Sequence, residues 1–270
     1  MKRQSEAIQQ IFPPPADPDW DINVSDNNIR AIIWDYDGTL VDTRLKNLNV
    51  TKSIIESITA IDAMEFPALR SLKSYYSANR RASNWRELYR QEFNLSEKQI
   101  DEAGRMWTAY QLNDRTEVAC YEGIEAVVSD LAKFPNGIVS QNSRSSIALN
   151  LERINLLPFF KYIVGYEEVD LDKQKPEPDG LLRCIQKLSA LESGYVCYIG
   201  DHETDVQCVC AANRALRKDD FDVRIVSIGA CYHSETDTST WRIRPDFEVQ
   251  RVEDILKIVE HIGRSDGKLK

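Results

Sequence analysis

Short apolar runs alternate with amphipathic segments over most of the chain. The runs predicted to form buried strands are residues 29–34, 137–139, 162–164, 195–199, 223–228 and 247–249. Between and after them, helical periodicity is found in 124–134, 144–154, 181–191, 204–217 and 252–262. Strands that alternate with helices are typical of right-handed βαβ units and a parallel sheet. The pattern therefore predicts an α/β protein with a Rossmann-like core.

One long segment departs from this alternation. Residues 45–118 contain four helical patterns and no convincing strand, which predicts an all-helical insertion. Residues 1–28 are polar, include three consecutive prolines and have no periodicity, as expected for an N-terminal arm. The predicted domains are thus the arm at 1–28, a core at 29–44 and 119–270, and a helical cap at 45–118.

The charge balance limits the classes of partner. The 270 residues include 34 basic and 43 acidic side chains, a net charge of −9. An acidic protein is poorly suited to bind nucleic acid or an anionic membrane. No apolar stretch reaches the length of a membrane span, and the N-terminus has no apolar run of signal-peptide length. We therefore expect a cytoplasmic monomer or homodimer that acts on a small molecule.

The six cysteines have no regular spacing in the sequence. Cys208 and Cys210 are two residues apart, but no second pair accompanies them, so a zinc site is not expected. Reduced, mostly buried thiols are the simpler interpretation.

Acidic residues follow two of the predicted strands. Asp35 and Asp37 come directly after the first strand, and Gly38 allows a tight turn there. Asp201 and Asp205 follow the strand at 195–199. Because ligands of parallel α/β sheets bind beyond the carboxyl ends of the strands, these carboxylates should lie near one another. Oxygen ligands gathered around one point are suited to Mg²⁺.

Two further segments are suited to bind an anion. Ser140, Gln141 and Asn142 follow the strand at 137–139 and precede a helix, where a hydroxyl and backbone N–H groups are available. Lys175 precedes two prolines that favour a non-helical loop. A lysine near several carboxylates would offset their mutual repulsion and attract a phosphate.

Together these four segments resemble the motifs of the haloacid dehalogenase superfamily of phosphohydrolases. WDYDGTLVDT, GIVSQNS, KPEPDG and YIGDHETDV match the four motifs in order, and the resemblance extends over about residues 29–262. The position of the helical insertion, soon after the first motif, is most similar to the phosphoglycolate phosphatase-like branch. The resemblance implies a Mg²⁺-dependent phosphatase that cleaves a small phosphorylated metabolite through an aspartyl-phosphate.

The resemblance also implies a role for each motif residue. Asp35 would be the nucleophile and a metal ligand, and Asp37 the general acid and base, with its main-chain carbonyl on the metal. Asp201 would be a further ligand, while Asp205 would support the metal or orient Lys175. The expected phosphate-binding residues are Ser140, Lys175 and either Gln141 or Asn142, with Thr39 fixing the loop.

Two features leave alternatives open. Many members of this branch have Asn directly after the hydroxyl residue of the second motif, whereas here Gln141 precedes Asn142. The amide partner of the phosphate is therefore open between these two residues. The four motifs also do not separate a phosphatase from a sugar phosphomutase of the same superfamily, and a non-catalytic phosphate-binding protein is a third, less favoured reading.

Overall fold

The computed structural model describes residues 28–82, 84–232 and 236–264. The predicted arm at 1–28 lies outside this range except for Asn28. By its internal contacts the chain divides into two compact units, the first comprising residues up to Val41 together with those from Cys120 onward, and the second Asp42–Ala119. Each unit is described here by itself.

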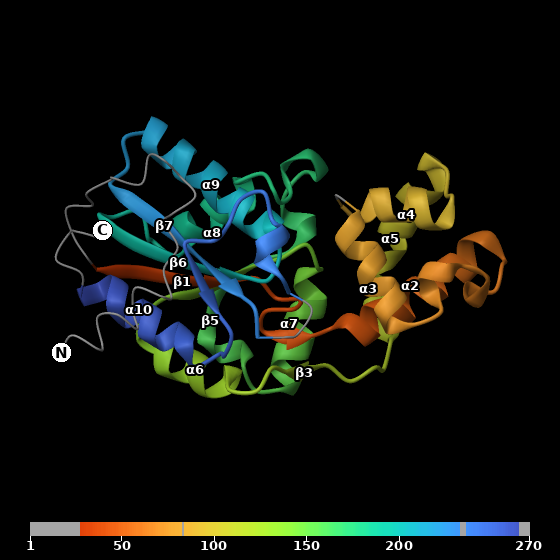
Figure 1. Ribbon diagram of the computed structural model, residues 1–270, viewed down its shortest axis with the longest axis horizontal. Helices are drawn as coiled ribbons and strands as arrows, with labels where there is room; N and C mark the ends of the chain where they lie inside the picture. The colour runs from red at the N-terminus through yellow and green to blue at the C-terminus, as the bar shows by residue number, and fades with distance from the viewer. Residues whose placement is uncertain (1–27, 83, 233–235, 265–270) are drawn as a thin grey trace. The chain divides into compact units, whose positions relative to one another are not determined.

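A six-stranded parallel sheet forms the centre of the first unit (Figure 1). Its strands, in spatial order, are β5 (Phe160–Val164), β4 (Asn136–Val139), β1 (Ile29–Trp34), β6 (Gly194–Gly200), β7 (Val223–Ala230) and β8 (Phe247–Val249). The chain adds strands on one side of β1 and then crosses to the other side. This order confirms the predicted parallel α/β fold and places the topological switch point at β1.

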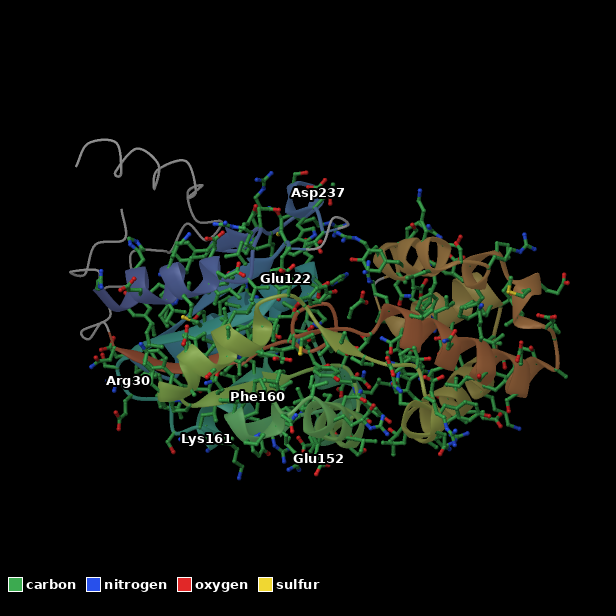
Figure 2. All side chains as sticks on the ribbon, turned by 90° about the horizontal axis from the view of Figure 1, so that it is seen from below. Arg30, Glu122, Glu152, Phe160, Lys161 and Asp237 are labelled. Carbon is green, nitrogen blue, oxygen red and sulfur yellow. The ribbon has the colours of Figure 1, made fainter. Side chains whose placement is uncertain are left out.

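Helices cover both faces of the sheet (Figure 1). They are α6 (Ile124–Asp130), α7 (Arg144–Arg153), α8 (Asp179–Lys187), α9 (Glu203–Lys218) and α10 (Asp254–Arg264). Short 3₁₀ turns occur at Leu131–Lys133, Leu157–Phe159, Tyr166–Glu168, Leu171–Lys173 and Thr238–Thr240. One face packs its apolar side chains against α8 and α9, for example Ile33 and Val196 against Leu181 and Val209. Charged side chains such as Lys161 and Glu152 lie on the surface (Figure 2).

The second unit, Asp42–Ala119, is mainly helical. It contains α2 (Arg44–Thr59), α3 (Leu72–Arg81), α4 (Trp85–Phe93) and α5 (Glu97–Asn113), with 3₁₀ turns at Ala63–Glu65 and Pro67–Leu69. Ser71 and Asn84 accept N-cap hydrogen bonds at the starts of α3 and α4. A core of its own, which includes Ile54, Leu88 and Ile100, is buried among these helices. This packing accounts for a compact unit without a sheet.

The chain leaves and re-enters the first unit through two short strands, β2 (Val41–Asp42) and β3 (Ala119–Cys120), which pair with each other. The hydropathy pattern did not predict them, because two-residue strands have no detectable periodicity. Within the described residues, no helix combines the length and the apolar character that a membrane span requires.

Asn213 on α9 stabilises the part of β7 that β8 does not reach. Its side chain donates to the Ile225 carbonyl at 2.8 Å and accepts from the Ile225 amide at 2.8 Å. The pairing of β8 begins only at Ile228. The side-chain amide of Asn213 thus takes the place of a neighbouring strand for Ile225.

We expect Asn213→Ala to lower the free energy of unfolding by about 2 kcal/mol, because two backbone groups of a buried strand lose their partners. Urea denaturation followed by circular dichroism measures the loss. Arg214→Ala, at the exposed neighbouring position, is the matched control and should change stability by less than about 0.5 kcal/mol. Equal stability of the two variants would contradict the assignment.

Candidate active site

The candidate site lies at the carboxyl ends of the three central strands. Asp35 directly follows β1, Ser140 follows β4 and Asp201 follows β6. These strands are neighbours in the sheet, and the Asp35 amide donates to the Ile199 carbonyl of β6 at 2.8 Å. Because the later strands are added on the other side of β1, Asp35 lies near both Ser140 and Asp201, each more than 100 positions away in the sequence.

A tight turn after β1 positions the first pair of carboxylates. The Gly38 amide donates to the Val41 carbonyl at 2.9 Å, and the Leu40 amide donates to the Tyr36 carbonyl at 3.1 Å. Gly38 has a φ of +82°, which side chains with a Cβ rarely adopt. A Cβ there would lie 2.4 Å from a carboxylate oxygen of Asp201. Glycine thus permits both the turn and the close approach of Asp201.

Lys175 joins two of the carboxylates. Its Nζ atom lies 2.7 Å from Oδ1 of Asp35 and 2.7 Å from Oδ1 of Asp205. All three side chains are buried, with exposed fractions of 5%, 10% and 4% for Lys175, Asp35 and Asp205. The predicted proximity of this lysine to the acidic residues is therefore present in the structure.

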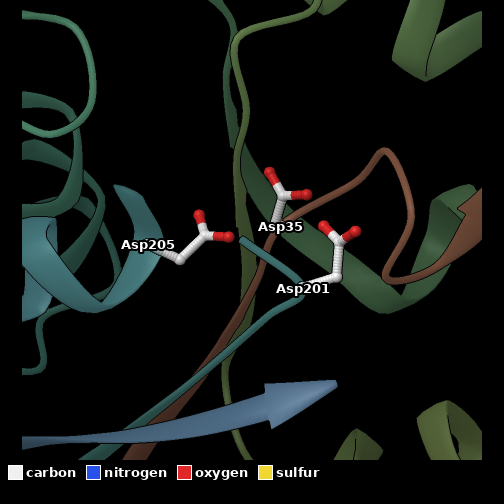
Figure 3. Close-up of side chains that lie close together, drawn as sticks. All are labelled: Asp35, Asp201 and Asp205. Carbon is white, nitrogen blue, oxygen red and sulfur yellow. The ribbon is translucent and has the colours of Figure 1, made fainter. Parts of the chain in front are cut away.

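Three carboxylates point into the same small space (Figure 3). One oxygen from each of Asp35, Asp201 and Asp205 lies within 4.8 Å of the others, and all three residues are buried. Such a set of hard oxygen donors can hold a divalent cation. Asp35 comes from the end of β1, Asp201 from the end of β6 and Asp205 from the first turn of α9.

Both oxygens of Asp205 already have donors within the protein. Oδ1 accepts from Lys175 and from the Tyr198 hydroxyl at 3.0 Å, and Oδ2 accepts from the His202 amide at 3.0 Å. The last contact belongs to the capping box at the start of α9. Of the two roles considered for Asp205, these contacts favour orientation of Lys175 over coordination of the metal.

Two residues of the second motif, Ser140 and Asn142, form hydrogen bonds with the Asp37 carboxylate. The Asn142 side-chain amide lies 3.2 Å from each oxygen of Asp37, and Ser140 Oγ lies 3.3 Å from Oδ2. The side-chain Oδ1 of Asn142 accepts from the main-chain amide of Ser143 at 2.8 Å, and this contact directs the side-chain NH₂ group of Asn142 to Asp37. Gln141 instead donates to the Lys175 main-chain carbonyl at 3.1 Å. The two amides that the sequence left as alternatives thus have different partners.

Burial and the neighbouring charges shift the pKa values of Asp35 and Lys175. Burial raises the pKa of Asp35 well above its usual range; Lys175 opposes the shift, and Asp205, Asp201 and Asp37 add to it. Burial alone would lower the pKa of Lys175, but Asp205 and Asp35 more than offset this and raise it. The raised pKa favours the charged ammonium form of Lys175. The four carboxyl groups around it exceed its single positive charge.

Two tyrosines at the site were not singled out from the sequence. Tyr198 lies in β6 and donates to Asp205, and Tyr232, just after β7, donates to the main-chain carbonyl of Thr39. Thr39 is fully buried, and its own hydroxyl makes no hydrogen bond within the described residues. Neither tyrosine stands out in the sequence, because Tyr198 shares its strand with another buried tyrosine, Tyr195, and Tyr232 lies outside the four motifs.

Comparison with known families gives a match that covers more than half of the chain. Residues 32–216 match the model of the haloacid dehalogenase-like hydrolase family. The chain belongs to this family. The match includes all four motifs and every predicted site residue.

Relatives and solved structures agree with this family assignment. The chain is 25% identical over 238 residues to pyrophosphatase PpaX of Listeria monocytogenes, covering 86% of this chain and 96% of the relative. PpaX of Oceanobacillus iheyensis is 27% identical over 241 residues, covering 86% and 97%.

Two solved structures share the fold. A predicted phosphatase from Clostridium acetobutylicum has a TM-score of 0.66 at 21% identity, covering 86% of this chain and 99% of that one. A predicted phosphoglycolate phosphatase from Haemophilus somnus has a TM-score of 0.63 at 16% identity, covering 85% and 97%. The family match and the relatives confirm the predicted superfamily and the predicted enzyme class, a phosphatase, and the two solved structures confirm the fold.

We expect Gly38→Ala to destabilise the haloacid dehalogenase-like protein by about 1–3 kcal/mol, because a Cβ is disfavoured at positive φ and would displace Asp201. Urea denaturation measures the effect. Gly263→Ala is the matched control, since a Cβ there meets its nearest neighbour at 3.8 Å. Gly263 lies in α10, where alanine is favoured over glycine, so this variant should be neutral or slightly stabilised. A neutral Gly38→Ala would contradict the proposed constraint.

Proposed function

We propose that the protein is a Mg²⁺-dependent phosphatase that hydrolyses a small phosphate monoester through an aspartyl-phosphate on Asp35. The observation that carries the proposal is the convergence of Asp35, Asp37, Ser140, Lys175 and Asp201 at one edge of the sheet. It supplies a buried carboxylate, a second carboxyl group held separately, a cation and a hydroxyl within one site. Covalent phosphoryl transfer requires these groups together.

In the proposed reaction, a carboxylate oxygen of Asp35 attacks phosphorus and the bond to the ester oxygen breaks. Asp37 donates its proton to the departing alkoxide. It then takes a proton from water, whose oxygen attacks phosphorus and releases the Asp35 carboxylate and inorganic phosphate. The contact from the Asn142 side chain supports this role, because it holds Asp37 in a defined orientation.

The residues present fit a magnesium ion. Asp35 and Asp201 would hold it through carboxylate oxygens and Asp37 through its main-chain carbonyl, with Asp205 engaged by Lys175. Gly38 leaves the space that the Asp201 carboxylate occupies. The ion would neutralise charge on the phosphoryl group as the bond to Asp35 forms. Lys175 would bind a phosphoryl oxygen and hold Asp35, and Ser140 would donate to a second phosphoryl oxygen.

Substrate selectivity is proposed to reside in the helical cap, residues 45–118. All the proposed reacting groups lie outside that segment and act on the phosphoryl group, which every substrate shares. We therefore propose that residues of the cap recognise the leaving group. A second candidate substrate is inorganic pyrophosphate, because the PpaX relatives carry the name pyrophosphatase. A screen of phosphate esters and pyrophosphate, with release of phosphate as the readout, would distinguish these substrates and would separate hydrolysis from a mutase reaction.

Asp35→Asn should lower kcat/KM to about a thousandth of the wild-type value or less, since an amide cannot attack phosphorus. Phosphate release from the best substrate of the screen measures it. Asp170→Asn, on the exposed loop before Lys175, is the control and should retain wild-type activity. Mass spectrometry must exclude deamidation back to aspartate. Activity above a few per cent of wild type in such a preparation would overturn the role of Asp35.

Removal of divalent cations should abolish turnover, and Mg²⁺ should restore it. Ca²⁺ should not restore it and should compete with Mg²⁺, because its larger and more flexible coordination shell would misplace Asp35. Activity after dialysis against a chelator, followed by titration with each cation, tests this. Undiminished turnover in the chelated enzyme would contradict the magnesium requirement.

A further inference from the structure

Tyr198 is a buried tyrosine in β6, three residues before Asp201. It lies in β6 with 1% of its surface exposed, and its ring packs in the core formed with α8 and α9. Its hydroxyl lies 3.0 Å from Oδ1 of Asp205 and 3.4 Å from the Val139 carbonyl. A tyrosine has one hydroxyl proton, and the carboxylate is both the closer and the stronger acceptor. The hydroxyl therefore donates to Asp205.

This donation completes the restraint of Asp205. Its Oδ2 is held by the His202 amide, and its Oδ1 receives Tyr198 in addition to Lys175. Burial and the nearby charges of Asp205 and Asp35 raise the pKa of Tyr198 well above its usual range. A raised pKa favours the protonated hydroxyl, which is the form that donates to Asp205.

Tyr198 also contacts Lys175 directly. The Lys175 Nζ atom lies 5.3 Å from the centroid of the Tyr198 ring, within the range of a cation–π interaction. The ammonium group is thus located by three neighbours, Asp35, Asp205 and the ring. The ring contact depends on Tyr198 directly. The contact with Asp205 depends on Tyr198 through the hydrogen bond from its hydroxyl to that carboxylate.

We propose that Tyr198 is a positioning residue for phosphoryl transfer, whose hydroxyl and ring hold the Asp205–Lys175 pair so that the Lys175 ammonium stays on Asp35. The inference rests on the proposed function, since it assigns Lys175 and Asp35 to the reaction. Tyr198 touches neither the phosphate nor Asp35 in this role. It acts through Lys175, so its loss should affect the rate of attack by Asp35 more than the binding of substrate.

Tyr198→Phe removes the hydroxyl and keeps the ring. We expect kcat to fall about tenfold, as for a lost hydrogen bond to a charged group, with KM changed by less than about twofold. Tyr195→Phe is the matched control, because Tyr195 is also buried and lies at the opposite end of the same strand from Asp201. It should leave both constants unchanged. An unchanged kcat in Tyr198→Phe would overturn the proposal.

A double-mutant cycle separates positioning from a general effect on folding. If Tyr198 acts through Asp205, then adding Tyr198→Phe to Asp205→Ala, which leaves no acceptor for the hydroxyl, should lower kcat by less than about twofold. A full tenfold loss in that background would mean that the hydroxyl does not act through Asp205, which contradicts the proposal.

A spectroscopic readout keeps this test independent of turnover. The ¹⁵Nζ signal of Lys175, assigned by its loss in Lys175→Met, should report an immobilised ammonium group in the wild type and in Tyr195→Phe. It should broaden or disappear in Tyr198→Phe and in Asp205→Asn, because exchange with water becomes faster.

A wild-type protein that hydrolyses no phosphate compound would overturn the proposed function alone. An unaltered Lys175 signal in Tyr198→Phe would overturn the role of Tyr198 alone.

Discussion

The buried ion pair between Lys175 and the carboxylates of Asp35 and Asp205 is the interaction on which the site depends. Transfer of an ammonium group or a carboxylate from water into a protein interior costs several kcal/mol, so a buried charge persists only with well-placed partners. Here one lysine satisfies two carboxylates at 2.7 Å each. Removal of Lys175 would leave two buried carboxylates without a compensating charge. The arrangement therefore restricts the conformations that each side chain can adopt.

This pair does not neutralise the site. Asp37 and Asp201 add two more carboxylates, and burial with this excess charge raises the pKa of Asp35. A nucleophilic carboxylate is needed in its ionised form, so the site is suited to a bound divalent cation. The same electrostatic excess that disfavours ionised Asp35 in the protein alone would favour the binding of Mg²⁺. Metal binding and activation of the nucleophile are thus proposed to be linked.

The sheet topology makes the site possible without a long chain segment devoted to it. The carboxylates Asp35, Asp201 and Asp205 directly follow a strand or lie in the first turn of a helix, so their backbone is fixed by buried elements. Lys175 comes from the loop before α8 and is held by its contacts with Asp35 and Asp205. Rigid elements hold reacting groups more closely than long loops do. The second amide of the motif, Asn142, is held in the same way, through its own contacts with Ser140 and Ser143.

The sequence by itself determined the parallel α/β fold, the helical insertion and the position of each motif at a strand end, because these depend on local hydropathy and on short-range spacing. It left open whether Gln141 or Asn142 is the amide partner of the phosphate. Only the structure shows that Asn142 faces Asp37, since neighbouring residues in a turn point in directions that only the complete backbone defines. It also did not reveal Tyr198, whose apolar surroundings in the strand were indistinguishable from those of any core residue. The contact of its hydroxyl with Asp205 arises only when α9 packs on β6, because tertiary packing decides where a buried side chain ends.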